Sequence, residues 1–374
     1  MIYFDYAATT PVDPDILKTY NKIAKEYWGN SSSLHRFGLR SNELLNHSYK
    51  EFQECLNLSG KRIIYTSGST EANNLAIYGI VNKYHGKKRH IITTSVEHPA
   101  VSEVFRSMEH HGVRVSFLSV DQNGLINLEE LRELMNKDTV LVSVMWVNNV
   151  IGTIQPIKEV MEIVKQYPKC SLLVDAVQGL TKVKPDFDLN DVDMFTLSTH
   201  KIYGTKGSGA LVYKTDLDLE QHLYGSKQQF GIKPGTVDLA NAVATTKAVK
   251  KYNAVLEEHY QDVLKKYNQL RSGLESNPKI LINSPKMNTS PYILNISIPS
   301  INGEVLVRHL EQKDIMVSTG AACSSKDKRL EKTVFATFHD ENRAMSSIRI
   351  SLSHLNTEEE IQILIEALQE ITGE

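Results

Sequence analysis

RIIYTSGSTEANNLAIYGIVNKY, residues 62–84, decides the fold. Residues 62–66 form a short run rich in apolar and β-branched side chains, which predicts a buried strand. Residues 71–84 place apolar side chains at helical spacing along one face, so they predict a helix packed on that strand. Residues 67–70 supply the glycine and small hydroxyl side chains of a tight turn between the two. A buried strand, a turn and a packed helix form the repeating unit of an α/β sheet.

The same alternation continues for about 130 residues. Further strands are predicted at residues 90–94, 113–119, 139–146, 171–175, 194–198 and 210–213, with helical patterns between several of them. Strands that are apolar on both faces and separated by helices belong to a mostly parallel sheet that is covered on each side. The predicted fold class is therefore α/β.

A different pattern begins near residue 238. A long helical stretch over residues 239–275 leads into strands and helices that alternate less regularly, which favours a smaller α+β domain. We expect a large domain over residues 12–258. The small domain is expected to combine residues 1–11 with residues 259–374.

Composition excludes several classes of protein. The formal net charge is −2 over 374 residues, so direct binding to nucleic acid or to an anionic membrane is not expected. No apolar run reaches the roughly 20 residues that span a bilayer, and the N-terminus lacks the pattern of a signal peptide. Three separated cysteines, Cys55, Cys170 and Cys323, argue against a disulfide framework or a zinc site. We expect a cytoplasmic protein without a metal.

Lys201 directly follows the strand predicted at residues 194–198, in the segment STHKIYG. A lysine at a strand end is usually a solvated surface residue. Here hydroxyl and imidazole side chains precede it and a glycine-rich turn follows, which suits a lysine that forms a Schiff base. Partial loss of hydration lowers the pKa of such an amine, as this chemistry requires.

Two further segments point to an anionic, aromatic ligand at the same sheet edge. Asp175 ends the predicted strand at residues 171–175; it could cap a helix, or it could pair with the nitrogen of a pyridinium ring. The SGST turn at residues 67–70 could cap the following helix, or its backbone N–H groups could bind a phosphate. Ligands of open α/β sheets bind beyond the carboxyl ends of the strands, where both segments fall.

Three other side chains are candidates for the chemistry. His98 follows a predicted strand and could stack on an aromatic cofactor, although a lone histidine is most often structural. Arg349 interrupts an apolar strand and could bind an amino-acid carboxylate through two parallel hydrogen bonds. Cys323 has small and basic neighbours that favour its reactive thiolate, whereas Cys55 and Cys170 are interpreted as structural.

Taken in order, these segments resemble the NifS/IscS-like cysteine desulfurases, a group within the class V aminotransferases. The resemblance runs almost from end to end and is carried by eight motifs: residues 3–11 (YFDYAATTP), 66–71 (TSGSTE), 97–98 (EH), 147–149 (VNN), 175–178 (DAVQ), 200–204 (HKIYG), 320–323 (GAAC) and 348–351 (IRIS). It implies a homodimer with the type I fold of pyridoxal-phosphate (PLP) enzymes.

The resemblance also implies the residues that hold the cofactor. Lys201 would bind PLP covalently, His98 would stack on its ring, Asp175 would pair with the ring nitrogen and Gln178 would bond the ring hydroxyl. Asn149 would also contact the cofactor. The phosphate would be held by hydroxyl and imidazole side chains, one of them from the other subunit: Thr70, Ser198, His200 and the partner-derived Thr236.

For the reaction, the resemblance implies that Arg349 and Asn149 position the carboxylate of L-cysteine. Cys323 would take the sulfur as a persulfide, leaving L-alanine, and pass it to an acceptor protein. A class V aminotransferase or a selenocysteine lyase would share the fold without needing Cys323. A PLP-fold protein that has become a binding scaffold is the alternative outside enzymes.

Several positions depart from the family pattern. Val150 stands where relatives carry an acid, and Trp146 where histidine is common. In the loop QQFGIKPGT, Gln229 replaces a glutamate and Lys233 an arginine. We expect these changes around the substrate mouth and the dimer contact. The chain also lacks the long tail that relatives use to dock an iron–sulfur scaffold. That favours an acceptor in tRNA thiolation, as in the NifZ-like branch, over general iron–sulfur cluster assembly.

Overall fold

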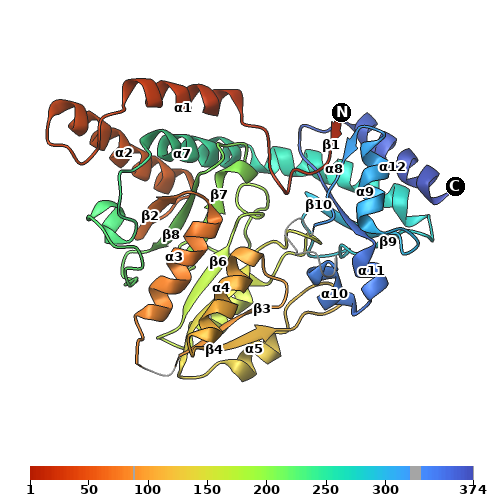
Figure 1. Ribbon diagram of the computed structural model, residues 1–374, viewed down its shortest axis with the longest axis horizontal. Coiled ribbons are helices and arrows are strands. Elements are labelled where there is room, and N and C mark those ends of the chain that lie inside the picture. Colours follow the sequence, from red (N-terminus) through yellow and green to blue (C-terminus); the bar gives the residue numbers. More distant parts are fainter. Residues whose placement is uncertain (87–88, 321–329, 374) are drawn as a thin grey trace.

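A computed structural model describes residues 1–86, 89–320 and 330–373 (Figure 1). The strands are β1 (Ile2–Tyr3), β2 (Lys61–Thr66), β3 (His90–Thr94), β4 (Arg114–Leu118), β5 (Thr139–Met145), β6 (Ser171–Asp175), β7 (Met194–Ser198), β8 (Gly209–Lys214), β9 (Leu281–Ile282), β10 (Ile293–Ser297), β11 (Ile315–Met316) and β12 (Ser347–Ser351). The α-helices are α1 (Pro14–Glu26), α2 (Arg36–Cys55), α3 (Ser69–Asn82), α4 (Pro99–His110), α5 (Leu128–Leu134), α6 (Ile157–Val164), α7 (Leu239–Ala254), α8 (Leu256–Glu275), α9 (Gly303–Glu311), α10 (Lys332–Phe338), α11 (Glu341–Met345) and α12 (Glu358–Thr372). The described residues also form the 3₁₀ turns η1 (Thr199–Lys201) and η2 (Gln228–Gly231).

A seven-stranded sheet in the order β2-β8-β7-β6-β5-β3-β4 confirms the predicted α/β class. Five of these strands pair in parallel with their neighbours, and β8 alone runs against both β7 and β2. Three strands, β3, β6 and β7, have the bounds that the sequence predicts. Because β8 reverses direction between β7 and β2, those two strands end at the same edge as β3, β5 and β6.

Both faces of this sheet are covered. Along β6, Leu172 and Val174 face one apolar core while Leu173 between them faces the other, as the two-residue period of a strand requires. Helices α1, α2, α6 and α7 contribute to the first core, and α3 and α4 to the second. The parallel strands are buried along most of their length, which explains their continuous apolar sequences.

A separate apolar core forms around the antiparallel sheet β12-β10-β9, covered by α8, α9 and α12. The two ends of the chain meet there: β1 pairs with β11, Asp5 bridges to Ser351, and Phe4 is fully buried in this core. Figure 1 shows both termini beside this smaller part of the molecule. The domain limits at residues 11–12 and 258–259 stay a prediction.

The prediction of one continuous helix over residues 239–275 is wrong, because two helices occupy this stretch. Val255 leaves helical geometry at φ −111° and ψ 15°, which separates α7 from α8. The two helices serve different cores, α7 packing beside α1 and α2 and α8 against α12. The chain must therefore change direction between them, a constraint that helical periodicity does not record. Of the described helices, none is long and apolar enough to cross a membrane.

Candidate active site

The carboxyl-end edge of the large sheet gathers the predicted site residues from separate segments. Asp175 ends β6, Ser198 ends β7, and Lys201 closes the η1 turn that follows. His98 caps α4 beyond β3, and Thr70 lies in the first turn of α3 beyond β2. Since these strands share one direction, their ends meet at one edge, as the sequence predicts.

Asp175 is buried and held in place by two hydrogen bonds. Its Oδ2 accepts from Asn73 Nδ2 at 3.0 Å, and its Oδ1 accepts from the backbone N–H of Val177 at 3.1 Å. Asn73 is itself held by the hydroxyl of Thr196, which donates to its Oδ1 at 2.8 Å. No α-helix begins at Asp175 in the described chain, so the helix-capping interpretation is wrong.

Lys201 meets the requirement for an amine that reacts near neutral pH. Its Nζ donates to the carbonyl oxygens of Ala7 at 2.7 Å and Ala8 at 2.5 Å. Burial lowers its pKa to about 8, with a further lowering from the positive charge of Arg349; Asp5 and Asp175 oppose the shift only in part. A lysine in this state carries a substantial neutral fraction at mildly alkaline pH and can act as a nucleophile or a base.

Two histidines flank this lysine. His98 Nδ1 accepts the backbone N–H of Ala100 at 3.1 Å. Loss of hydration lowers the pKa of His98, with smaller lowering from Lys201 and Arg349 against the pull of Asp175. Burial likewise lowers the pKa of His200 to about 4, helped by neighbouring lysines. Both imidazoles are therefore neutral at physiological pH.

The start of α3 has the features of an anion site. Gly68 occupies the N-cap with φ 149° and offers no side-chain cap, so the first backbone N–H groups are not satisfied by it. A Cβ on Gly68 would lie 3.6 Å from Ser198 Oγ, and a Cβ on Gly209 would lie 2.8 Å from Gly68 Cα. This close approach of three segments favours the phosphate-binding interpretation over ordinary capping.

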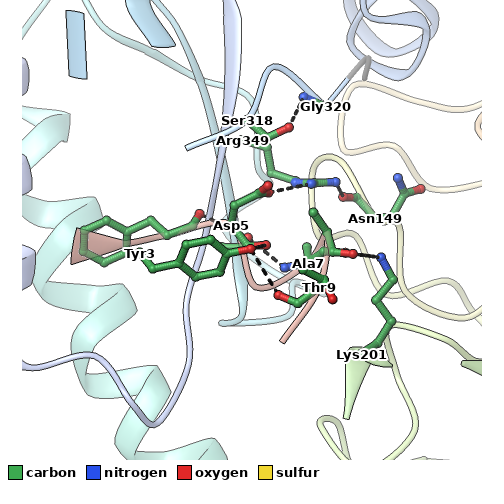
Figure 2. A network of polar contacts seen from close by, with 12 residues as sticks. Tyr3, Asp5, Ala7, Thr9, Asn149, Lys201, Ser318, Gly320 and Arg349 are labelled. Carbon is green, nitrogen blue, oxygen red and sulfur yellow. Dashed lines mark hydrogen bonds and ion pairs between the residues drawn. The ribbon is translucent and has the colours of Figure 1, made fainter. Parts of the chain in front are cut away.

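Arg349 extends from the middle of β12 to the same region (Figure 2). Its two terminal nitrogens donate to the Asn149 carbonyl oxygen and to Asp5 Oδ1, each at 2.9 Å. Its Nε is buried and has no hydrogen-bond partner among the described residues. A guanidinium that is anchored but incompletely bonded is well suited to a ligand carboxylate.

Cys323 lies outside the described residues. The chain leading to it passes beside Arg349, because the backbone N–H of Arg349 donates to Ser318 O at 2.6 Å and the N–H of Gly320 donates to Ser318 Oγ at 3.2 Å. Burial raises the pKa of the Cys55 thiol to about 12 and raises that of Cys170 as well, so neither forms a thiolate readily.

Of the remaining predicted residues, Gln178 and Asn149 are connected to other site residues by hydrogen bonds among the residues that the structure describes, and Thr236 is not. Gln178 Nε2 donates to Ala7 O at 2.9 Å, so it shares that carbonyl with Lys201. Asn149 is joined to Arg349 through its backbone carbonyl, as Figure 2 shows. Thr236 lies exposed between η2 and α7, and within the described chain no hydrogen bond connects it to the other site residues.

The four positions that depart from the family pattern lie in different parts of the structure. Trp146 is buried against Gly179, where an added Cβ would lie 2.3 Å from the indole ring, so the expectation that it lies at the substrate mouth is wrong. Val150 is buried in a small apolar cluster with Ile151 and Val334, and a Cβ on Gly320 would lie 3.5 Å from its methyl group. Gln229 and Lys233 instead bond the backbone of Tyr65 at the end of β2.

Sequence reasoning missed Asp5, Lys182 and Glu97. Asp5 falls inside a motif that carries the family resemblance, but nothing in the sequence pairs it with Arg349, 344 residues away. Lys182 reads as an ordinary surface lysine yet is buried. Glu97 precedes His98 and has one buried oxygen without a partner among the described residues.

Comparison with known proteins identifies the family. The model of the family "Aminotransferase class-V" matches residues 2–364. The chain belongs to the class V aminotransferase family. Among curated relatives of this family, a NifS/IcsS protein homolog of Lactobacillus delbrueckii subsp. bulgaricus is 40% identical, covering 99% of this chain and 97% of the relative. A cysteine desulfurase IscS of Neisseria meningitidis is 35% identical, covering 100% and 92%.

A solved structure described as a NifS-like protein superposes with a TM-score of 0.92 at 32% identity, covering 99% of each chain. Class V aminotransferases are PLP-dependent enzymes, and the residues present here fit that cofactor. The chain offers a lysine of lowered pKa, an anchored buried carboxylate at Asp175, and an uncapped helix start for a phosphate.

Proposed function

We propose that this protein is a cysteine desulfurase that converts L-cysteine to L-alanine and holds the released sulfur on Cys323. The convergence of Lys201, Asp175 and Arg349 at one sheet edge is the observation that supports it most directly. The relatives named as cysteine desulfurases match the chain over its full length, which supports the same activity.

The cofactor would be held by the residues assembled at this edge. We infer that Lys201 binds it covalently, His98 stacks on it, and Asp175 and Gln178 bond its ring. Asn149 would also contact the cofactor. The phosphate would be bound by hydroxyl, imidazole and backbone groups: Thr70, Ser198, His200 and, from a second copy of the chain, Thr236. When bound, PLP withdraws electrons from the bonds around the α-carbon of an amino acid.

The chain's own groups would carry the remaining steps. Arg349 and Asn149 bind the substrate carboxylate, and Lys201 moves the proton at the α-carbon. The Cys323 thiolate then attacks the substrate sulfur: an S–S bond forms, the C–S bond breaks, and the carbon takes a proton to become alanine. Cys323 is left as a persulfide. The raised pKa values of Cys55 and Cys170 support Cys323 as the nucleophile.

We further infer a cytoplasmic homodimer that passes its sulfur to a tRNA-thiolating protein or an iron–sulfur scaffold. The exposed placement of Thr236 supports a site shared between two copies, since this residue lies apart from the others within one chain. The large domain would span residues 12–258. Residues 1–11 and 259–374 would form the small domain.

The Cys323→Ala variant tests the activity. We expect it to retain the yellow cofactor absorbance but to lose persulfide formation and alanine release from cysteine. Cys55→Ala is the matched control, because its thiol has a raised pKa and should be dispensable. Full alanine release by Cys323→Ala would sink the desulfurase mechanism and favour an aminotransferase or a selenocysteine lyase.

The acceptor requires its own experiment. Cysteine labelled with ³⁵S, incubated with the enzyme and candidate acceptors, should transfer label to a tRNA-thiolating protein in preference to an iron–sulfur scaffold. Equal or preferential labelling of the scaffold would contradict the tRNA-thiolation assignment. A colourless protein that takes up no PLP would instead favour the non-enzymatic scaffold.

A further inference from the structure

Lys182 is a second buried lysine beside the candidate active site. It follows β6 in the same turn as Gln178, four residues later, and 7% of its surface is exposed. Its Nζ donates to Gln178 Oε1 at 2.9 Å and lies 5.9 Å from the centre of the Tyr292 ring. No described carboxylate lies within ion-pair distance of this amine.

Burial of this amine is costly. Burial is the main cause that lowers the pKa of Lys182 to about 7, and the positive charges of Lys201 and Arg349 lower it as well. An apolar side chain of similar length would fill the same space without a desolvation penalty. A lysine retained here therefore has a role that depends on its N–H donors.

The hydrogen bonds of Gln178 show what those donors do. Lys182 Nζ donates to Gln178 Oε1 in the structure, and in its protonated form it cannot accept, so only the Oε1 atom of the amide can then face it. The Ala7 carbonyl accepts and cannot donate, so only Nε2 can face Ala7. The two contacts together allow one orientation of the amide. Without Lys182, the Oε1 end of the Gln178 amide would lose the hydrogen bond that holds it.

The orientation matters because Ala7 O also accepts from Lys201 Nζ at 2.7 Å. Lys182, Gln178, Ala7 and Lys201 thus form one chain of donors and acceptors from the turn after β6 to the reactive amine. Asp175 and Asp5 lie close enough to Lys201 to oppose the lowering of its pKa.

We propose that Lys182 is a positioning residue that locks the Gln178 amide with its N–H₂ group directed into the cofactor site. The inference rests on the proposed function, since it assigns the donor that meets the ring oxygen of PLP. A donor directed at that oxygen stabilises its negative charge, which lowers the pKa seen in the absorbance of the bound cofactor.

The test is the pH titration of cofactor absorbance in the holoenzyme, which a merely structural lysine would not affect. Lys182→Met is expected to raise the spectral pKa by about one unit, and Lys182→Arg, which keeps the donors, to restore it. In a Gln178→Leu background the same Lys182→Met change should shift the pKa by less than about 0.3 unit. Lys61→Met removes another buried lysine, which bonds Val192 O, and should leave the spectral pKa unchanged.

Equal shifts in the parent and Gln178→Leu backgrounds would show that Lys182 acts through its charge alone and would overturn the lock. If Lys182→Met does not fold, Lys182→Gln replaces it, because glutamine can also accept and so frees the Gln178 amide to turn. An unshifted spectral pKa in that variant overturns the lock while the proposed function stands. A parent protein that binds no PLP overturns both.

Discussion

Glu97 shows how burial alone can set the protonation of a side chain next to the active site. Its Oε1 accepts from Thr94 Oγ1 at 3.0 Å and from the backbone N–H of Met145 at 2.8 Å, while Oε2 is buried without a described partner. Burial raises its pKa to about 8, and the negative charge of Asp175 adds to the shift. The carboxyl group of Glu97 is therefore mostly protonated near neutral pH.

Glu97→Gln is expected to change how stability depends on pH. The pKa of Glu97 in the folded state, about 8, lies above its ordinary value of 4.5, so the folded parent holds an extra proton between these limits. The parent therefore loses stability as pH rises from 5 to 8, whereas the variant, having no such proton, does not. Urea unfolding of the apoproteins should show that the free energy of unfolding of Glu97→Gln, relative to that of the parent, rises by at least about 1 kcal/mol from pH 5 to pH 8.

The same comparison supplies its own control. At pH values well below 4.5 the carboxyl group is protonated in both the folded and the unfolded protein, so the free energies of unfolding of parent and variant should show the same pH slope there. A difference between them that stays constant from pH 5 to pH 8 would show that Glu97 titrates normally and is hydrated in solution.

Among the elements, the loop around η2 holds the end of β2 and the start of α3 together. Strand β2 is an edge strand, and the free N–H and C=O of Tyr65 pair with the side-chain amide of Gln229 at 2.7 and 3.1 Å. Lys233 bonds Tyr65 O at 3.2 Å and forms an ion pair with Glu71 at 3.0 Å. Glu71 in turn accepts the backbone N–H of Ser67 at 2.6 Å, which fixes the proposed phosphate loop.

Lys233→Met is predicted to weaken PLP binding by about tenfold, equivalent to about 1.4 kcal/mol. Burial favours protonated Glu71, but the bonds from Ser67 and Lys233 outweigh it and lower the pKa of this carboxyl group. Removing Lys233 loosens Glu71 and hence the Ser67 backbone. Titration of apoprotein with PLP, followed by absorbance, measures the effect.

Lys227→Met is the matched control, since it removes an exposed lysine from the same loop. If both variants bind PLP as the parent does, the loop is not held by the ion pair. If both bind equally weakly, the general positive charge of the loop matters and the specific contact to Glu71 does not.

At the scale of the whole molecule, large apolar side chains remain exposed in the connection between α1 and α2 and in η2. Figure 1 shows the α1–α2 connection on the side of the molecule away from both termini. Trp28 is 75% exposed and Leu34 is 91% exposed in the connection between α1 and α2. Phe230 in η2 is half exposed and its ring packs beside that of Tyr49 in α2. Exposed apolar side chains gathered in this way are typical of a protein interface.

A Trp28→Glu, Leu34→Glu double variant should therefore dissociate the proposed homodimer. Two buried charges at a symmetric interface act in both copies, so we expect a shift from dimer to monomer in sedimentation or light scattering. PLP affinity should fall with it if Thr236 serves the partner's site. Leu355→Glu alters an exposed leucine elsewhere and should leave the dimer intact. A monomeric parent protein would contradict the prediction.

The sequence alone was sufficient for the features that depend on local patterns. Short, largely apolar runs located β3, β6 and β7 to the residue, because strands buried on both faces lack the alternating exposed positions of a half-buried strand. The rule that ligands of open α/β sheets bind beyond the carboxyl ends of the strands predicts that Asp175 and Lys201 lie at one edge.

Only the tertiary structure decided which distant side chains share a hydrogen bond. The pairing of Arg349 with Asp5, the shared carbonyl of Ala7, and the burial of Lys182 depend on the chain's first residues lying against its last strand and its central turn. The break at Val255 likewise follows from two cores that lie in different directions. Periodicity and residue type describe a segment's own faces, whereas these contacts are set by how separate segments pack.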